Sequence, residues 1–275
     1  MSSLGIIMIV RDEIDIIKKN IFFHANQGFD YFAIMDNSSK DGTRELIEEI
    51  SRDVPMKIFS KLETDYRQDI WATELAGYLS QIGIDFAISL DADEFIMPTK
   101  STFREISSES KTPLILQRHN MLPAKSDLGR FMVAPFDATR YRVAKPLQTQ
   151  LPIMLRRMPG KVFFPLRGLR SIARGNHGVE HEISERVTSE DALIRHFPVG
   201  RYSQFLTKLD HARERFRQEC NVSPLVSWHI RRWLKLQDEG KIEEEYNSFF
   251  LSDEDLATHI ANGTVKRDDF CEKVE

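Results

Sequence analysis

Two aspartates that stand one residue apart, Asp91 and Asp93, are the side chains of this sequence with the clearest chemical meaning. They directly follow an apolar stretch of strand type at residues 86–90. In an extended chain, residues i and i+2 point to the same side, so both carboxylates can converge on one small cation. Mg²⁺ and Mn²⁺ prefer oxygen ligands and bind readily beside diphosphates. The pair therefore predicts a metal-assisted diphosphate site, and the alternative is a solvated acidic turn.

Strands and helices are expected to alternate through the first hundred residues. Strand-like stretches occupy 4–10, 31–35, 56–60 and 86–90, and helical spacing of apolar residues fills 14–27, 42–52 and 67–81. Gly28 is suited to end the first helix, and Asp41 is suited to cap the second. Strands that alternate with helices of this length form a parallel sheet covered on both faces. The expected fold class is therefore α/β, with a mostly parallel central sheet flanked by helices.

Acidic residues follow three of these strands. They are Asp12 and Glu13 after the first strand, Asp36 and Asp41 after the second, and Asp91 and Asp93 after the fourth. Ligands of parallel sheets bind outside the carboxyl ends of the strands. We therefore expect the carboxylates to lie along one edge of the sheet, which favours a binding site over an isolated acidic turn.

The rest of the chain is less regular. We expect a short helix at 103–107, strands at 113–118 and 192–196, a hairpin of 155–157 with 161–164, a mobile arginine-rich loop at 167–178, and helices from residue 203 onward. Little periodicity is visible between residues 120 and 150.

The composition is that of an ordinary globular protein, with 41% hydrophobic and 29% charged residues among 275. A formal net charge of -4 argues against a nucleic acid partner. Cys220 and Cys271 are far apart and predict neither a disulfide framework nor a cysteine metal site, which fits a reducing cytosol. No apolar run approaches the roughly 20 residues of a membrane span. We expect a cytoplasmic protein without a transmembrane segment; peripheral membrane contact and the oligomeric state stay open.

Several short segments stand in a characteristic order along the chain. They are Ile9-Val10-Arg11-Asp12-Glu13, Phe23-His24, residues 28–31, residues 35–43, Tyr66-Arg67-Gln68, Leu90-Asp91-Ala92-Asp93-Glu94-Phe95, Gly175-Asn176-His177, Ile194-Arg195-His196-Phe197 and residues 203–208. This ordered set resembles the GT-A-fold glycosyltransferases of the family 2 type, with an Asp-x-Asp-Glu-Phe form of their metal motif. The resemblance covers residues 4–98 well and 171–210 in patches.

The resemblance implies a fold and an activity. Residues 1–200 would form a GT-A-like catalytic domain that binds a nucleotide sugar, and residues 201–275 a helical extension packed on it. The enzyme would transfer a sugar from a nucleoside diphosphate donor, a UDP-sugar, to a saccharide or lipid-linked acceptor. The transfer would use Mn²⁺ or Mg²⁺ and invert the anomeric centre.

The resemblance also implies roles for particular residues. Asp93 would bind the metal directly and act in catalysis, Asp91 would bind it through water or touch the ribose, and His177 would complete the metal site. The residues expected to contact the nucleotide sugar are Arg11, Glu13, Asp36, Asn37, Gln68, Asp91, His196 and Lys208. An inverting enzyme also needs a general base. Glu94, Glu180 and Glu182 are open candidates, although Glu94 points away from Asp93 in an ideal strand.

Several of these residues have a second interpretation. Asp36 could form local hydrogen bonds in its turn, and Glu13 could be a carboxylate of a first helical turn. His177 and His181 would suit zinc if they lay on a helix, but the glycines beside them argue against a helix. Residues 228–236 interleave aromatic and basic side chains, which suits either an anionic membrane surface or, more commonly, a helix that packs its tryptophans on the core.

Three other functions compete with sugar transfer. A sugar-phosphate nucleotidyltransferase should carry a glycine-rich loop after its first strand, where Arg11-Asp12-Glu13 stands here. A phosphatase with an Asp-x-Asp pair should carry that pair on its first strand. A non-catalytic module that only binds nucleotide sugars or glycans would bind the donor without consuming it.

Overall fold

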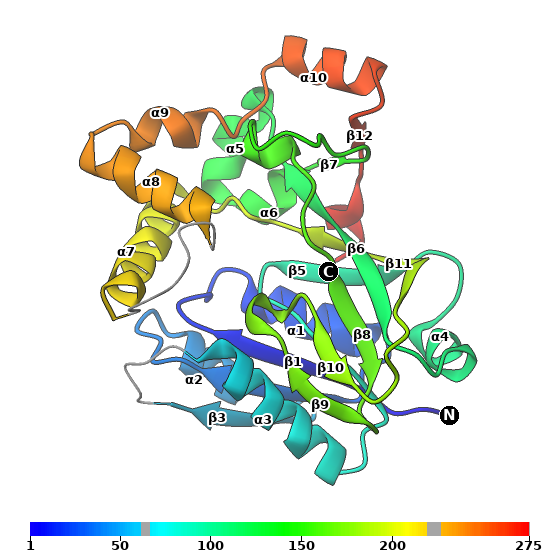
Figure 1. Cartoon of the computed structure of the whole chain (residues 1–275). Coiled ribbons are helices and arrows are strands. Elements are labelled where there is room, and N and C mark those ends of the chain that lie inside the picture. Colours follow the sequence, from blue (N-terminus) through cyan, green and yellow to red (C-terminus); the bar gives the residue numbers. More distant parts are fainter. Residues whose placement is uncertain (62–66, 219–226, 275) are drawn as a thin grey trace.

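The computed structural model describes residues 1–61, 67–218 and 227–274 and places a ten-stranded sheet at the centre of the molecule (Figure 1). Four parallel strands form its N-terminal half in the order β4-β1-β2-β3. They are β1 (Leu4–Val10), β2 (Tyr31–Asp36), β3 (Met56–Ser60) and β4 (Phe86–Ser89), joined by α1 (Ile17–Asn26), α2 (Thr43–Ile50) and α3 (Gln68–Gln81). These strands and helices agree with the sequence-based expectation to within a few residues.

Antiparallel pairing dominates the other half of the sheet, which continues from β4 in the order β8-β6-β7-β12. These strands are β8 (Lys161–Pro165), β6 (Leu114–Leu122), β7 (Tyr141–Val143) and β12 (Val265–Arg267). In addition, β11 (Val187–His196) pairs in parallel with β6 and antiparallel with β5 (Glu94–Pro98). The predicted α/β class, with a central sheet flanked by helices, is confirmed.

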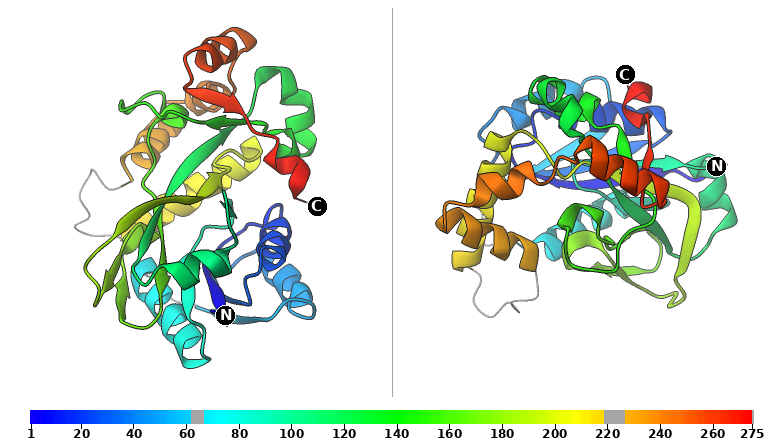
Figure 2. Two further views of the ribbon diagram at one scale, coloured as in Figure 1. Left: turned by 90° about the vertical axis from the view of Figure 1, so that its right-hand side faces the viewer. Right: turned by 90° about the horizontal axis from the view of Figure 1, so that it is seen from above.

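Helices cover the two faces of the sheet through the alternation of side chains along each strand (Figure 2). On β1, Ile6 and Met8 pack in one apolar cluster with α1, α2 and α4 (Phe103–Glu109). Ile7 points to the opposite cluster, which contains α3 and the hairpin of β9 (Leu169–Ile172) and β10 (Val179–His181). The buried β1 is therefore held from both sides, and its carboxyl end has a fixed position.

A second core lies around the C-terminal helices. Its elements include α5 (Leu128–Val133), α6 (Pro135–Ala138), α7 (Tyr202–Gln218), α8 (Trp228–Asp238), α9 (Ile242–Asn247) and α10 (Asp253–Ala261). Segments from before and after residue 200 meet in it: the ring centroids of Phe131 and Phe250 lie 4.9 Å apart. Trp233 of α8 is half-buried and packs against Phe205 and Phe249, so this tryptophan lies against the core. The division at residue 200 stays a prediction.

Short 3-10 turns complete the structure at Lys125–Asp127, Ile153–Leu155, Arg174–Asn176 and Phe270–Lys273. Cys271 is buried and its thiol donates to the carbonyl of Thr139, while Cys220, Tyr66 and Leu225 lie outside the described residues. In the ranges that the structure describes, no helix combines the length and the apolar character that crossing a bilayer requires.

The structure corrects two local predictions. The hairpin of 155–157 with 161–164 was wrong, because residues from 161 onward pair with β4 and β6 instead. Gly160 explains why this segment can lie so close to β6. A Cβ atom at this position would lie 2.5 Å from the carbonyl oxygen of Leu116, so only glycine allows the approach. The loop expected at 167–178 contains β9, whose partner β10 was not visible in the sequence pattern.

Two helix boundaries also differ slightly from the expectation. α1 begins at Ile17, three residues later than the apolar spacing indicates. Gly42, in the left-handed conformation, occupies the N-cap of α2. Asp41 still serves this helix start, because its Oδ1 accepts from the backbone N–H of Thr43 at 2.9 Å.

Candidate active site

A cavity of about 500 Å³ opens where β1, β2 and β4 end. Its walls come from the segment after β1, the turn after β2, the Asp91–Asp93 turn after β4, the end of β11 and one face of α7. Asp36 is the last residue of β2 and pairs in register with Val10 of the neighbouring β1. The expectation that the acidic segments gather at one edge of the sheet therefore agrees with the coordinates.

Helix α7 closes the cavity from the opposite side. Lys208, His211 and Arg215 follow at helical spacing and all line the cavity. The ring Nε2 of His211 lies 3.1 Å from Asp12 Oδ2, and Arg11 Nη2 lies 3.2 Å from Glu214 Oε2. These two contacts hold α7 to the segment that follows β1.

Lys208 stands between two carboxylates. Its Nζ lies 3.0 Å from Glu13 Oε1 and 3.4 Å from Asp93 Oδ2. Burial lowers the pKa of Lys208, but the two carboxylates outweigh burial and hold this pKa above its usual value. Burial, together with the charges of Asp93 and Asp91, raises the pKa of Glu13 against the opposing effect of Lys208. One ammonium thus holds the two carboxylates in place.

His196 faces Asp93 with its acceptor nitrogen. Asn120 donates through Nδ2 to the carbonyl of Met154 at 2.9 Å, so its Oδ1 is the atom that faces His196 Nδ1, 2.8 Å away. The Nδ1 of His196 must then carry the proton, and Nε2 offers a lone pair toward Asp93 Oδ1 at 3.7 Å. Burial lowers the pKa of His196, which favours this neutral form.

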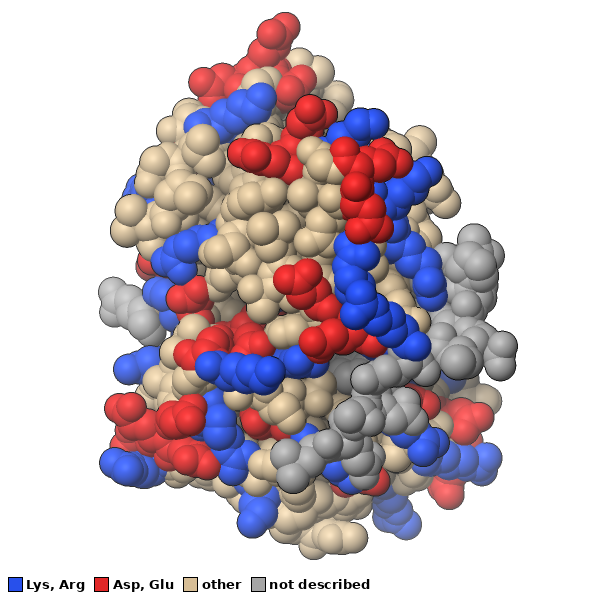
Figure 3. Space-filling view, turned by 90° about the vertical axis from the view of Figure 1, so that its left-hand side faces the viewer, with Lys and Arg blue, Asp and Glu red and all other residues tan. Residues whose placement is uncertain are grey.

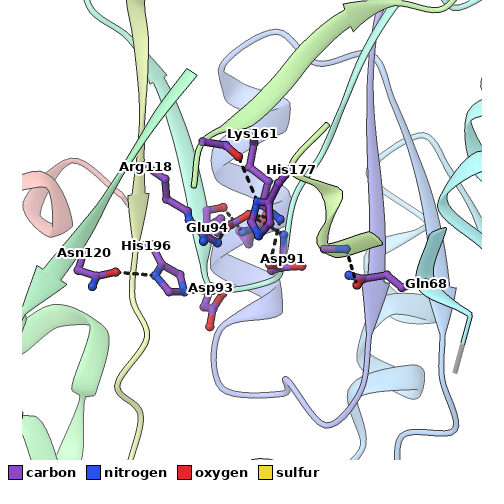
Figure 4. Close-up of polar contacts among 12 residues, drawn as sticks. Gln68, Asp91, Asp93, Glu94, Arg118, Asn120, Lys161, His177 and His196 are labelled. Atoms are coloured by element: carbon purple, nitrogen blue, oxygen red, sulfur yellow. Dashed lines mark hydrogen bonds and ion pairs between the residues drawn. The ribbon is translucent and has the colours of Figure 1, made fainter. Parts of the chain in front are cut away.

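A buried ionic cluster fixes the turn that carries Asp91 (Figure 4). Lys161 is fully buried, and its Nζ lies 3.0 Å from Asp91 Oδ2 and 3.1 Å from Glu94 Oε2. Arg118 Nη1 lies 2.6 Å from Glu94 Oε1, and Glu94 Oε2 accepts from the backbone N–H of Asp91. Burial alone would raise the pKa of Glu94, but Lys161 and Arg118 lower this pKa to about 2. Glu94 is therefore an ionised anchor inside the protein.

Seven of the residues singled out by sequence line the cavity, namely Arg11, Glu13, Asn37, Asp91, Asp93, His196 and Lys208. Five others lie outside its lining: Asp36, Gln68, Glu94, His177 and Glu182. The roles of all twelve residues in binding and catalysis stay predictions. The structure separates them only by position, into those that line the cavity and those that do not.

The five outlying residues have local partners or solvent around them. Asp36 is buried and accepts from the N–H of Ser39 at 3.3 Å, and Gln68 Oε1 accepts from the N–H of Gly175 at 3.3 Å. His177 Nδ1 lies 3.1 Å from the carbonyl oxygen of Gly160. Burial, Lys161 and Arg118 lower the pKa of His177 to about 4. Glu182 is exposed next to the β9–β10 hairpin.

The hydrogen bonds of His181 do not support the alternative of a zinc site. Its Nδ1 accepts from the N–H of Ile183 at 3.0 Å, so Nε2 is the donor to the carbonyl of Pro165 at 3.2 Å. Both ring nitrogens are thus engaged. Within the described ranges, no three side chains of His, Cys, Asp or Glu are grouped to hold a metal by themselves.

Sequence reasoning missed Lys161, Arg118 and Asn120. Each has a weak signal, because a lysine that opens an apolar strand and polar residues inside β6 are exceptions to the pattern around them. Such exceptions indicate a buried partner but do not identify it.

No family model matches this chain, and no curated protein matches it. Among solved structures, S. aureus TarS 1-349 in complex with UDP-GlcNAc aligns with 94% of this chain and 73% of that chain, at 11% identity and a TM-score of 0.46. The complex of TarS 1-349 with UDP aligns with 43% of this chain and 36% of that chain, at 16% identity and a TM-score of 0.35.

HddC from Yersinia pseudotuberculosis aligns with 43% of this chain and 59% of that chain, at 10% identity and a TM-score of 0.30. The aligned part spans 36% and 22% of the length of two of the TarS structures. At such identities and TM-scores, the likeness assigns no activity to the chain.

Proposed function

We propose that this protein is a glycosyltransferase that moves a sugar from a nucleoside diphosphate donor, a UDP-sugar, to a hydroxyl acceptor. The cavity at the carboxyl ends of the parallel strands supports the proposal, because open α/β sheets bind their ligands at that edge. Asn37 and Ser38 lie on the side of β2, where a nucleoside would fit. Arg11, Lys40 and Lys208 supply positive charge for a diphosphate.

One observation carries the proposal most directly. Asp93 Oδ1 and His196 Nε2 face each other at 3.7 Å, and both are acceptors while His196 is neutral. Two facing acceptors are stabilised by a cation between them. A hard divalent ion in proteins often has one or two side-chain ligands and takes the rest of its shell from substrate phosphates and water. Asp93 and His196 therefore fit Mn²⁺ or Mg²⁺ in the presence of a diphosphate.

A cation bound there would neutralise the charge that develops on the leaving diphosphate. The side chains do the remaining work. Asn120 orients His196 through Nδ1, as partners of metal-binding histidines commonly do. Lys161 and Arg118, through Glu94, hold the turn that presents Asp91 and Asp93, and so we assign Glu94 to positioning. Lys208 places a further positive charge beside Asp93 for the phosphates. Inversion follows if the acceptor attacks from the side opposite the diphosphate.

The test combines binding and turnover. We expect UDP with Mn²⁺ to raise the melting temperature of the wild-type protein, and UDP-sugars to be converted with release of UDP. Asp93→Asn should abolish the effect of Mn²⁺ in both assays, whereas Asp53→Asn, at an exposed position after α2, should behave like wild type. Binding without UDP release would indicate a non-catalytic module. No melting shift and no UDP release with any UDP-sugar would overturn the proposal.

A further inference from the structure

A second cavity, of about 220 Å³, adjoins the first. It lies between α1, α6 and the start of α7, and it has three residues in common with the cavity described above: Glu13, Asp93 and Lys208. The two cavities thus meet at one shared wall, which is the point where Lys208 joins the two carboxylates. A group bound in the second cavity would meet a group bound in the first across this wall.

The walls of the second cavity are mostly apolar. Phe136 and Phe197 form part of it, with ring centroids 4.4 Å apart, and Phe205 and Val133 also line it. Val133 is 74% exposed, so an apolar side chain stands at its open side. Such walls suit a ring that presents a face of C–H groups.

The charged residues of the second cavity are paired with one another. Arg201 Nη1 lies 2.8 Å from Asp15 Oδ2, and Lys19 Nζ lies 3.3 Å from Asp137 Oδ1. The side-chain amide of Gln204 also donates to Asp15. Acidic and basic side chains are likewise interleaved on the face that Figure 3 shows. With the shared wall included, four carboxylates and three cationic side chains line the cavity. The lining therefore has no positive excess, and the cavity suits a neutral ligand better than an anionic one.

We propose that the second cavity binds the acceptor as a neutral saccharide, and that Glu13 on the shared wall takes the proton of its reacting hydroxyl. This inference rests on the proposed function. The acceptor oxygen forms a bond to the anomeric carbon of the donor. The bond from that carbon to the diphosphate oxygen breaks, and its electron pair leaves with the diphosphate. The hydroxyl proton passes to the carboxylate of Glu13, so atoms and charges balance.

Position distinguishes Glu13 from the other carboxylates. Glu94 is fully buried and ion-paired with Lys161 and Arg118, so an acceptor cannot reach it. Glu182 is exposed by the β9–β10 hairpin and lines neither cavity. Asp93 lines both cavities but faces His196, where we place the cation. Glu13 also lines both cavities, and it is not one of the proposed cation ligands.

Filling the second cavity provides the first test. Ala134 lines it and is half-buried, so Ala134→Trp adds volume inside it, and Ala257→Trp on exposed positions of α10 is the matched control. The probes are methyl glycosides of glucose, galactose, mannose and N-acetylglucosamine. We expect Ala134→Trp to lower transfer to the accepted glycoside at least about tenfold, with UDP affinity and donor hydrolysis by water within about twofold of wild type. Val133→Trp repeats the test from an exposed position if Ala134→Trp fails to fold.

Glu13→Gln provides the second test. We expect transfer to fall by about 10²–10⁴-fold, the usual contribution of a general base, while UDP affinity stays within about threefold. Glu13→Asp should recover part of the transfer rate. An equal loss of UDP affinity in Glu13→Gln would overturn the assignment and make Glu13 a nucleotide contact, as the family resemblance implies.

The outcomes distinguish a failure of this inference from a failure of the proposed function. Absence of UDP binding in the wild type would overturn the proposed function. Retained UDP binding, with unchanged transfer in Ala134→Trp or Val133→Trp, would overturn only the acceptor cavity. Retained UDP binding and hydrolysis, with no glycoside of the panel accepted, would overturn only the assignment of a neutral saccharide.

Discussion

His196 turns Nε2 toward Asp93 Oδ1 across 3.7 Å, and its tautomer is set from behind by Asn120. The orientation of the Asn120 amide is in turn set by the carbonyl of Met154. A chain of hydrogen bonds from the interior therefore directs a lone pair into the cavity, so three residues that are far apart in sequence determine the chemistry at one point.

Removal of Asn120 should weaken cation binding without touching the cation ligands. We expect Asn120→Ala to lower the affinity for Mn²⁺ in the presence of UDP by about 10–100-fold, the usual effect of losing a partner of a metal-binding histidine. Calorimetric titration with Mn²⁺ measures this affinity. Asn247→Ala, at the exposed end of α9, is the control. Unchanged Mn²⁺ affinity in a folded Asn120→Ala protein would contradict the assignment of His196.

Removal of one partner of the Lys161–Glu94 pair should lower the stability of the protein strongly. Both side chains are fully buried, and Lys161→Met leaves a buried carboxylate that lacks this ammonium. We expect the free energy of unfolding to fall by about 3–5 kcal/mol. Urea denaturation measures it, and the exposed pair of Lys241 and Glu239 gives the control, for which Lys241→Met should cost less than about 1 kcal/mol. The double variant with Glu94→Gln should lose less than the sum of the single changes; strict additivity would argue against direct coupling.

His24 should make the protein less stable in mild acid. It is fully buried, its Nδ1 lies 2.9 Å from the carbonyl oxygen of Asn20, and its Nε2 accepts from the N–H of Ile96 at 3.1 Å. Burial lowers its pKa to about 3, although the contact with Asn20 acts in the other direction. The unfolded chain binds a proton at the ordinary histidine pKa of 6.5, so between pH 6.5 and about 3 the unfolded state holds more protons. The stabilisation is therefore present above pH 6.5 and is lost as pH falls.

The expected size of this effect is up to about 1.4 kcal/mol of unfolding free energy per pH unit. Urea denaturation at pH 7, 6 and 5 measures the slope for the wild type and for His24→Gln. Other histidines contribute to both proteins equally, so the difference between the two slopes reports His24. Parallel slopes would show that His24 does not titrate in the way its burial implies.

The sequence predicted the parallel half of the fold because each of its elements carries a local signal. The apolar stretch of β1, Gly28 after α1 and the carboxylates after three of the four strands are all readable one segment at a time. Convergence at one edge then followed from the general geometry of parallel sheets. The segments that line the cavity, around Glu13, Asn37 and Asp93, were identified in this way.

The antiparallel half carries information that only the tertiary structure supplies. Lys161 could not be linked with Asp91 from sequence, because β8 reaches β4 only after an excursion of some seventy residues. Asn120 faces His196 because β6 and β11 are parallel neighbours in matching register, which no local pattern encodes. The second cavity was missed for the same reason, since α1, α6 and α7 meet there from distant segments.

Lys208 should bind the phosphates of the donor. Its removal should therefore lower the affinity for UDP but leave the affinity for uridine unchanged. The Nζ of Lys208 lies 3.4 Å from Asp93 and points into the cavity wall where a diphosphate is proposed. A charged hydrogen bond contributes about 1.5–3 kcal/mol, so Lys208→Met should lower UDP affinity by about 10–100-fold. Calorimetry with UDP and with uridine separates the phosphate contribution from that of the nucleoside. Lys57→Met, at an exposed position of β3, should leave both affinities unchanged. Lys208 also holds Glu13 in place. If Lys208→Met only disturbed the local structure around Glu13, the affinities for uridine and for UDP would fall equally, and that result would reject a phosphate contact.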